Sequence, residues 1–308
     1  MTTLTVARTS APMHLPQPSQ PYQRPPNRQA LQITGRNYVS YSQLNLMRNC
    51  PKKFSLQYLE KVPRDFIPVS LVHGGSIHAA LEGYFRARLE GLTLSAEEML
   101  LAYHAAWKRN LQDAGQQVPV KYGAKEDEPA VHALAERTIT AFLASPLASP
   151  KGTVLGVEEE LRIVLHPDLP DVLAKVDLVT HSDTALYVTD FKTSRSRWTP
   201  QKAQESSDQL VIYASATADM AAQMGLPVKL AFAVLTKAKT PIVQILPVPT
   251  DTSRVAAMTE SAVQTWAAIV AGHFYPNPSP MNCTGCPFRS RCPAFHPQQV
   301  APSSGRTP

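Results

Sequence analysis

Apolar and polar positions follow two different periods along this chain. In many segments the apolar residues recur every three or four positions, as on one face of a helix. Other segments are short apolar runs bounded by breakers, which is typical of strands. Helices are predicted at 40–60 (interrupted near Pro51), 73–90, 96–112, 129–144, 200–224 and 252–271, and strands at 154–165, 172–180, 185–192, 229–236 and 242–247. This order predicts an α/β protein of the mixed α+β type, with a mixed sheet flanked by helices and a helical insertion at about 90–150.

Both ends of the chain lack this periodicity. Residues 1–36 contain six prolines and many Gln, Ser and Thr residues, and residues 297–308 look similar. Segments of this kind bury too little apolar surface to offset the entropy lost on ordering. We therefore expect disordered tails at 1–36 and 297–308 around one folded domain at 37–296.

Composition and charge narrow the class of protein. The 308 residues are 44% hydrophobic, which is ordinary for a globular domain. No apolar run approaches the roughly 20 residues of a membrane span, and the N-terminus lacks an apolar signal core, so we expect an intracellular protein. Of the net charge of +6, residues 1–36 supply four arginines without an acid and residues 283–308 supply three, which leaves −1 for residues 37–282. The body is not basic, so affinity for a nucleic acid would depend on local patches, the tails or a bound metal.

The segment Lys175–Thr193 combines two apolar strands with charged side chains. Asp177 lies inside the first strand, and Asp190 and Lys192 end the second. A carboxylate in an apolar strand must be paired, exposed at an edge or bound to a metal, because an unpaired buried charge is very costly. Side chains alternate along a strand, so Asp190 and Lys192 share one face. Such residues suit a Mg²⁺ ion and the water it activates, which is chemistry for cutting a phosphodiester bond; a purely structural ion pair is the competing interpretation.

Four further residues occur in order around this segment. Glu158 lies in the preceding strand, in a run of three glutamates that compete for its role. His78 follows a Gly-Gly-Ser-Ile sequence in an early helix. Gln209 and Tyr213 are four residues apart in a predicted helix, so their side chains face the same way. All four occur at plausible places around one sheet.

The order His, Glu, Asp, Asp-x-Lys, Gln-x-x-x-Tyr closely resembles the RecB-type branch of the PD-(D/E)xK nucleases, over about Ser40–Cys292. The resemblance implies a restriction-endonuclease-like central sheet. It also implies site roles, namely metal binding by His78, Asp177 and Asp190, water activation by Lys192, and supporting catalytic positions for Glu158, Gln209 and Tyr213.

Four cysteines form a separate pattern, with one early in the chain and three at its end in the spacing Cys-x2-Cys-x5-Cys. They are Cys50, Cys283, Cys286 and Cys292. Disulfides fit poorly with an intracellular protein. Four thiolates can bind Zn²⁺ or a [4Fe–4S] cluster, and spacing alone does not decide between them. The arrangement resembles the iron–sulfur subgroup of the family, which includes CRISPR-associated exonucleases and AddB-type nucleases. That resemblance implies a [4Fe–4S] cluster on the segment 283–292.

The resemblance predicts a Mg²⁺- or Mn²⁺-dependent deoxyribonuclease, an exonuclease on single-stranded DNA or DNA ends. It would act in recombination, repair, CRISPR or phage DNA metabolism, in the cytoplasm of a prokaryotic cell or phage-infected host. The sequence has no helicase phosphate-binding motif of the form G-x-x-x-x-G-K-[ST], so unwinding would need a helicase or recombination partner. Two alternatives remain: an inactive iron–sulfur or zinc scaffold that binds DNA, and a structural zinc protein with chance motifs.

Overall fold

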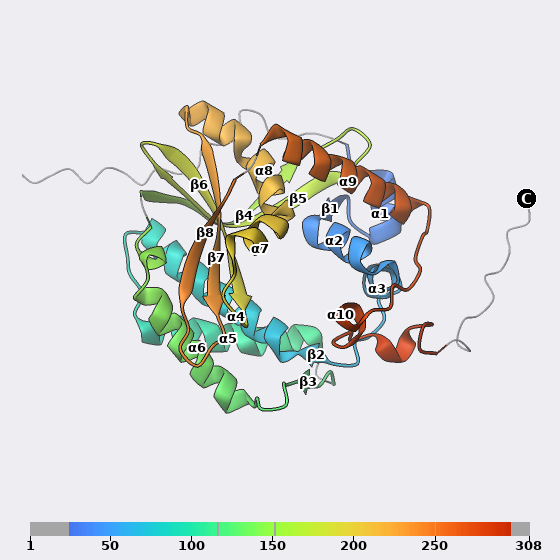
Figure 1. Cartoon of the computed structure of the whole chain (residues 1–308), viewed down its shortest axis with the longest axis horizontal. Coiled ribbons are helices and arrows are strands. Elements are labelled where there is room, and N and C mark those ends of the chain that lie inside the picture. Colours follow the sequence, from blue (N-terminus) through green and yellow to red (C-terminus); the bar gives the residue numbers. More distant parts are fainter. Residues whose placement is uncertain (1–24, 116, 151, 250, 297–308) are drawn as a thin grey trace, which may run out of the picture.

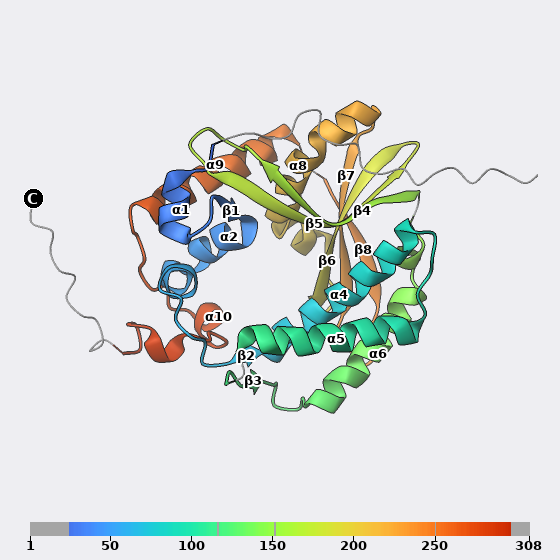
Figure 2. The ribbon, with the colours of Figure 1, turned by 180° about the vertical axis from the view of Figure 1, so that it is seen from behind.

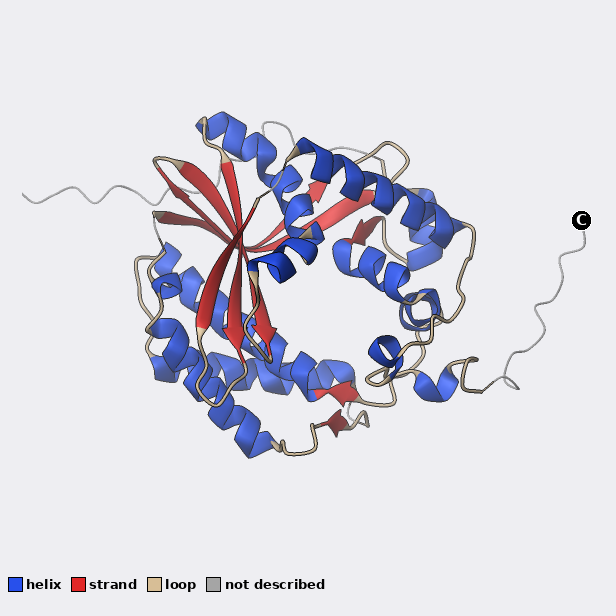
Figure 3. Ribbon diagram, viewed as in Figure 1, coloured by secondary structure: helices blue, strands red, loops and turns tan. Residues whose placement is uncertain are grey.

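The computed structural model describes residues 25–115, 117–150, 152–249 and 251–296, and its centre is a six-stranded mixed sheet (Figures 1 and 3). The strands are β1 (Tyr38–Ser40), β4 (Thr153–Ile163), β5 (Asp171–Ser182), β6 (Ala185–Ser194), β7 (Val228–Thr236) and β8 (Val243–Val248). The pairs β4–β5, β5–β6 and β7–β8 are antiparallel, whereas β1–β5 and β6–β7 are parallel. The predicted mixed sheet is confirmed.

Helices cover both faces of this sheet (Figure 1). They are α1 (Arg28–Thr34), α2 (Tyr41–Asn49), α3 (Pro51–Phe54), α4 (Val69–Leu89), α5 (Ala96–Ala114), α6 (Glu128–Leu143), α7 (Pro200–Glu205), α8 (Asp208–Met224), α9 (Thr252–Val270) and α10 (Pro280–Cys283). One core joins the sheet to α2, α8 and α9, and the other joins it to α4, α5 and α6. Along β6, Val188 belongs to the first core and Phe191 to the second, as expected when strand side chains alternate.

The strands β5 and β6 separate part-way along their length. Their pairing ends at Leu178↔Thr189, and from Asp190 onward β6 is paired with β7. Because β4 occupies one edge of β5 throughout 172–181, β1 and β6 must share the other edge. Beyond the Leu178↔Thr189 pair, β5 and β6 run in different directions (Figure 2). On this edge of β5, residues 174–177 pair with neither strand, because β1 pairs only up to Leu173 and β6 only from Leu178 onward. We call this opening, bounded by residues 174–177 and 190–193, the fork.

The predicted helix at 200–224 is wrong in one respect, since it forms two helices, α7 and α8. The break lies at Ser207, whose hydroxyl donates to the carbonyl of Gln204 at 2.6 Å. The Arg254 guanidinium also donates to that carbonyl, at 3.0 Å. A carbonyl satisfied by side chains no longer needs the next turn of helix, so α7 can end there.

The predicted tail at 1–36 extends too far, because residues 28–34 form α1. The Asn27 side chain accepts from the backbone N–H of Ala30 at 2.8 Å and caps the start of this helix. Gly35 adopts the left-handed conformation at φ 72° and ends it. Residues 1–24 and 297–308, on which the rest of the predicted tails falls, lie outside the described residues.

The predicted helical insertion at about 90–150 consists of α5 and α6, together with the short strand β3 (Val120–Lys121). These helices pack on α4 and share its core rather than forming a core of their own. β3 pairs in parallel with β2 (Ile67–Pro68), and the pattern of the sequence predicted neither of these two-residue strands. No helix in the described part of the chain is long and apolar enough to cross a membrane.

Candidate active site

All seven catalytic and metal-binding residues predicted from the sequence line a single cleft of about 680 Å³ at the fork. They come from three strands and two helices that are distant in the sequence. The residues are His78 on α4, Glu158 on β4, Asp177 on β5, Asp190 and Lys192 on β6, and Gln209 and Tyr213 on α8. The structure thus brings the whole predicted set together, while the role of each residue stays a prediction.

The two aspartates lie at the base of the fork, one position beyond the last β5–β6 pair. Asp177 is 7% exposed and Asp190 is 1% exposed. The backbone N–H of Phe191 donates to Oδ2 of Asp177 at 2.6 Å. The strands diverge here, so the N–H of Phe191 has no backbone acceptor on β5, and the Asp177 carboxylate accepts its hydrogen bond instead. The same bond holds the Asp177 carboxylate toward the cleft.

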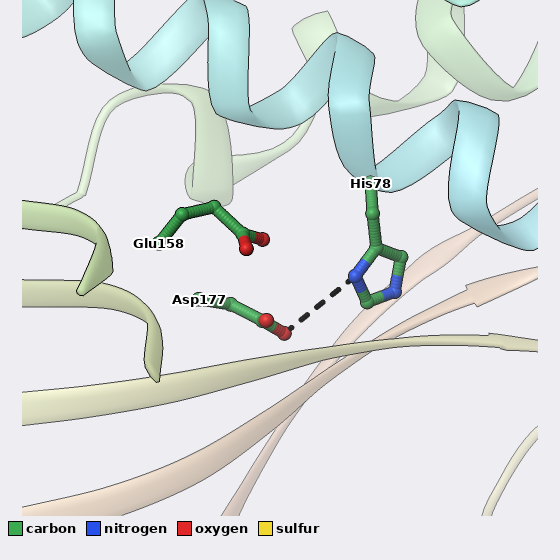
Figure 4. A group of neighbouring side chains, drawn as sticks. All are labelled: His78, Glu158 and Asp177. Carbon is green, nitrogen blue, oxygen red and sulfur yellow. Dashed lines mark ion pairs between the residues drawn. The ribbon is translucent and has the colours of Figure 1, made fainter. Parts of the chain in front are cut away.

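Asp177 contributes to a group of three ligand atoms (Figure 4). One atom each of His78, Glu158 and Asp177 lies within 4.8 Å of the other two, and Nδ1 of His78 is 3.8 Å from Oδ2 of Asp177. The register of β4 and β5 puts Glu158 opposite Asp177, and Glu158 has a φ of 54°, which is rare for a residue other than glycine. The sequence analysis assigned metal binding to His78, Asp177 and Asp190. In the structure Glu158 takes the place of Asp190 in this group, and the Asp190 carboxylate pairs with Lys192.

A glycine brings helix α4 close enough to place His78 in the cleft. A Cβ atom on Gly74 would lie only 3.1 Å from Oγ1 of Thr193 on β6. His78 is one helical turn further along α4, and its ring meets Phe191 edge-to-face with 5.9 Å between centroids. Gly74, the first glycine of the Gly-Gly sequence before His78, therefore has a structural reason, which is the close approach of α4 to the end of β6.

Burial sets the protonation of the acidic groups. Desolvation raises the pKa of Asp177 to about 7, and the nearby Glu158 carboxylate adds to the rise. Desolvation also raises the pKa of Asp190 to about 6, with a further contribution from Asp177, although Lys192 opposes it. Burial lowers the pKa of His78, so the imidazole is neutral and able to act as a ligand. Desolvated carboxylates beside a neutral imidazole form a donor set that a divalent cation would stabilise.

Helix α8 holds the lysine in place through a chain of contacts. Nζ of Lys192 is 2.5 Å from Oδ2 of Asp190 and donates to Oε1 of Gln209 at 2.9 Å. Nε2 of Gln209 donates to the hydroxyl of Tyr213 at 2.5 Å, and that hydroxyl donates to the carbonyl of Lys175 on β5. Gln209 and Tyr213 thus link β6 to β5 across the fork and orient the Lys192 ammonium.

Sequence reasoning missed Lys175 as a member of the site. Its ammonium is 2.5 Å from Oε2 of Glu158, and its side chain is 55% exposed at the cleft. Lys175 lies two residues before Asp177 on the same strand, so both side chains point to one face. The Lys-x-Asp spacing was the signal that could have identified it.

The four cysteines also come together, at the opposite end of α2 from the sheet. All are half-buried free thiols that line one small pocket between the end of α2, α10 and the C-terminal segment. In the described residues no three of their sulfur atoms lie within 4.8 Å of one another. Thiolates around one zinc ion would be about 3.8 Å apart for Zn–S bonds of about 2.3 Å. Such a set of three close ligand atoms is therefore not preformed among the described thiols.

Hydrogen bonds within the protein already join this cysteine segment to the N-terminal helices. Nδ2 of Asn282 donates to the carbonyl of Asn49 at 2.9 Å, next to Cys50. The backbone N–H of Lys52 donates to the carbonyl of Tyr275 at 2.9 Å. The four thiols are thus positioned by the polypeptide itself.

Comparisons with known proteins agree with this geometry. A family model described as the PD-(D/E)XK nuclease superfamily matches residues 38–293. The chain is similar to a crystal structure from Eubacterium rectale described as a "putative exonuclease", with 12% identity, a TM-score of 0.51, and coverage of 92% of this chain and 95% of that chain. It is also similar to the crystal structure of SSO0001, with 15% identity, a TM-score of 0.32, and coverage of 82% and 96%. No curated protein matches the chain. The first structure supports the fold alone, whereas the family match spans most of the sequence.

Proposed function

The chain belongs to the PD-(D/E)XK nuclease superfamily, and on that basis we propose that it is a divalent-metal-dependent deoxyribonuclease, acting as an exonuclease on single-stranded DNA or DNA ends. The observation that carries the proposal is the convergence of Asp177, Asp190 and Lys192 at the fork, beside His78 and Glu158. These are the residue types that phosphodiester hydrolysis by a metal-bound water needs.

The acidic end of the cleft fits a divalent cation. His78, Glu158 and Asp177 would hold it, since their ligand atoms already lie within 4.8 Å of one another. Asp190 adds a buried carboxylate at the same place, and burial raises the pKa values of both aspartates, so a cation beside them would stabilise their ionised forms. A bound Mg²⁺ or Mn²⁺ would neutralise charge on the phosphate and lower the pKa of a bound water.

The other residues orient the substrate and the attacking water. Lys192 presents an ammonium at the cleft, and the Gln209 amide holds it from behind. That ammonium can donate to the water or to a phosphate oxygen as negative charge develops there. Lys175 keeps the Glu158 carboxylate turned into the cleft and is exposed enough to meet a phosphate as well.

The size and shape of the space around the site support a polynucleotide substrate. A second cavity of about 830 Å³ adjoins the cleft and shares Tyr41, Lys192 and Gln209 with it. It continues along α2 to Lys53, which also borders the cysteine pocket. Two adjoining cavities of these volumes suit several nucleotides of a strand better than a small molecule. The preference for DNA ends rests on the resemblance to RecB-type nucleases.

The cysteines support a second part of the proposal, an iron–sulfur cluster with a structural role. Cys50, Cys283, Cys286 and Cys292 line one pocket, and four thiolates can bind either a zinc ion or a [4Fe–4S] cluster. The choice of the cluster rests on the resemblance of the cysteine arrangement to the iron–sulfur subgroup of the family. The cluster would tie α2 to the C-terminal segment, and an electron is not needed for hydrolysis.

The test is digestion of end-labelled single-stranded and double-stranded DNA by anaerobically purified protein, with Mg²⁺, Mn²⁺ or EDTA. We expect labelled products with either metal and none with EDTA. Binding of DNA without cleavage across both metals would instead identify a DNA-binding scaffold. The same preparation should contain iron and sulfide; zinc in its place would overturn the cluster assignment.

A further inference from the structure

A third cavity, of about 370 Å³, lies next to the catalytic cleft on the far side of the start of α4. Ser70, in the first turn of α4, borders both this cavity and the catalytic cleft, which makes them neighbours. The wall of this third cavity includes three cations, and no residue of it takes part in the proposed hydrolysis. We call it the basic pocket, defined by Lys121, Arg195 and Lys237.

The register of the sheet explains how two of these cations meet. The parallel strands β6 and β7 end together at the pair Ser194↔Thr236, and the next residues are Arg195 and Lys237. The backbone N–H of Lys237 donates to the carbonyl of Ser194 at 2.6 Å and keeps the two chain segments side by side. Ligands in α/β sheets commonly bind at the carboxyl ends of parallel strands, which is where these cations are placed.

The third cation reaches the pocket from the two-stranded sheet. In β3, Lys121 lies opposite Pro68 of β2. Its ammonium is 4.3 Å from the centre of the Phe66 ring, and a cation over an aromatic face is held there. Three separate segments of the chain therefore deliver one positive charge each to the same wall.

These charges are not balanced inside the protein. The one carboxylate of the pocket is Glu126, whose Oε2 accepts from the backbone N–H of Gly123 at 3.1 Å. Within the described ranges, neither Arg195 nor Lys237 forms an ion pair. Burial lowers the pKa of Lys237 and the Arg195 charge lowers it further, although the Glu126 carboxylate opposes this shift. A half-buried ammonium facing another cation is stabilised by an anion that enters between them.

We propose that the basic pocket binds a phosphate group of the DNA strand that is being cut at Asp190 and Lys192. The proposal rests on the proposed nuclease function. Arg195 lies three positions beyond Lys192 along the extended chain, a distance of about 10 Å. At a rise of about 3.4 Å per stacked nucleotide, the bound phosphate lies within about three nucleotides of the scissile bond. The phosphate is either the terminal one of the strand or an internal phosphodiester.

The test measures affinity for a fluorescent single-stranded oligonucleotide in EDTA, by anisotropy, at several salt concentrations. The variants are Lys237→Met and Arg195→Met, each of which removes one charge and keeps much of the side chain. Loss of one phosphate contact should weaken binding about fivefold at 0.1 M salt and reduce the slope of log K against log salt by about 0.7. Lys229→Met, at the other end of β7 and outside the pocket, is the matched control and should bind as the wild type does.

Lys121→Met is a further variant, at an exposed side chain whose removal leaves the core untouched. It should also weaken binding and reduce the salt slope. Wild-type affinity and slope in Lys121→Met, Arg195→Met and Lys237→Met together would overturn the proposal.

Oligonucleotides with and without a 5′ or 3′ phosphate then identify the source of the phosphate. If the variants lose the same affinity for every oligonucleotide, the pocket binds an internal phosphodiester. If they lose affinity only for oligonucleotides with one phosphorylated end, the pocket binds that terminal phosphate. The two proposals can be disproved separately. If the wild type cuts DNA and every variant binds DNA normally, only the proposal of phosphate binding in the basic pocket is wrong. If Lys237→Met binds DNA more weakly but the wild type never cuts DNA, the proposed nuclease function is wrong and the phosphate site stands.

Discussion

Replacing Asp177 with asparagine should make the metal-free protein more stable while abolishing its response to metal. In the folded protein the pKa of Asp177 is raised from 3.8 to about 7, mainly by desolvation. Between these values the folded state binds more protons than the unfolded state, so the contribution of this group to stability falls as the pH rises from 4 to 7. Above pH 7 the ionised carboxylate opposes folding in full.

The stability gained by Asp177→Asn can be worked out from the raised pKa of Asp177. About three pKa units at about 1.4 kcal/mol each correspond to about 4 kcal/mol at pH 8. Water in the open cleft reduces this penalty, so we expect Asp177→Asn to gain about 2–4 kcal/mol there. The asparagine oxygen can still accept from the N–H of Phe191, which removes the charge without breaking the fold at this point.

Urea denaturation in EDTA at pH 8 and pH 5 measures this difference. The gain in free energy of unfolding should be largest at pH 8 and about a third of that at pH 5, where Asp177 is protonated in the folded wild type but ionised in its unfolded state. Asp183→Asn, at the exposed hairpin turn between β5 and β6, is the control and should change little at either pH. The reasoning is refuted if Asp177→Asn is less stable than the wild type at pH 8, or if its gain does not depend on pH.

Further predictions concern the metal, the lysine, a glycine and the cysteines. Mg²⁺ should raise the urea midpoint of the wild type and leave that of Asp177→Asn unchanged; equal shifts in both would place the metal elsewhere. Lys192→Met should retain DNA binding and lose about 10²–10³-fold in single-turnover cleavage, since it removes one donor at the developing charge; a loss of affinity alone would contradict that role. Gly152→Ala should lower stability by more than about 3 kcal/mol, because its Cβ would lie 1.8 Å from the carbonyl oxygen of His181 at a φ of 86°. Gly91→Ala, at a φ of 77° with open space around it, should lower stability by only about 1 kcal/mol. Cys286→Ser should lower the iron content of anaerobically purified protein, and unchanged iron would exclude this thiol as a ligand.

Much of the fold follows from the periodicity of the sequence. The strands β4 to β8 and the helices α4, α5, α6 and α9 occur within a few residues of their predicted positions. These elements have long amphipathic or apolar patterns that no local feature contradicts. The short elements β1, β2 and β3 depend on partners distant in the sequence, so no local pattern predicts them.

The residues of the site could be predicted by type and order, whereas their geometry could not. Whether Glu158 or a neighbouring glutamate faces the cleft depends on the register of β4 and on its positive φ. The place of Asp177 depends on where β5 and β6 separate, which is a property of the whole sheet. The ion pair of Lys175 with Glu158 and the convergence of Arg195 with Lys237 likewise arise only when strands are paired.

The charge distribution in the fold could not be predicted from the sequence either. The count along the sequence put the positive excess on the two ends and left the body near neutral. The structure shows that a neutral body can still concentrate cations, as it does at the carboxyl ends of β6 and β7. Local charge therefore depends on register rather than on composition.

The central claim is that the acidic fork cuts DNA with a bound divalent metal. The most direct measurement is single-turnover cleavage of end-labelled DNA in Mg²⁺ by the wild type, Asp190→Ala and the control Asp183→Ala, whose carboxylate lies at the far end of the same hairpin. We predict cleavage by the wild type and Asp183→Ala, and a loss of about 10³-fold or more in Asp190→Ala. Cleavage by Asp190→Ala at the wild-type rate would contradict the account.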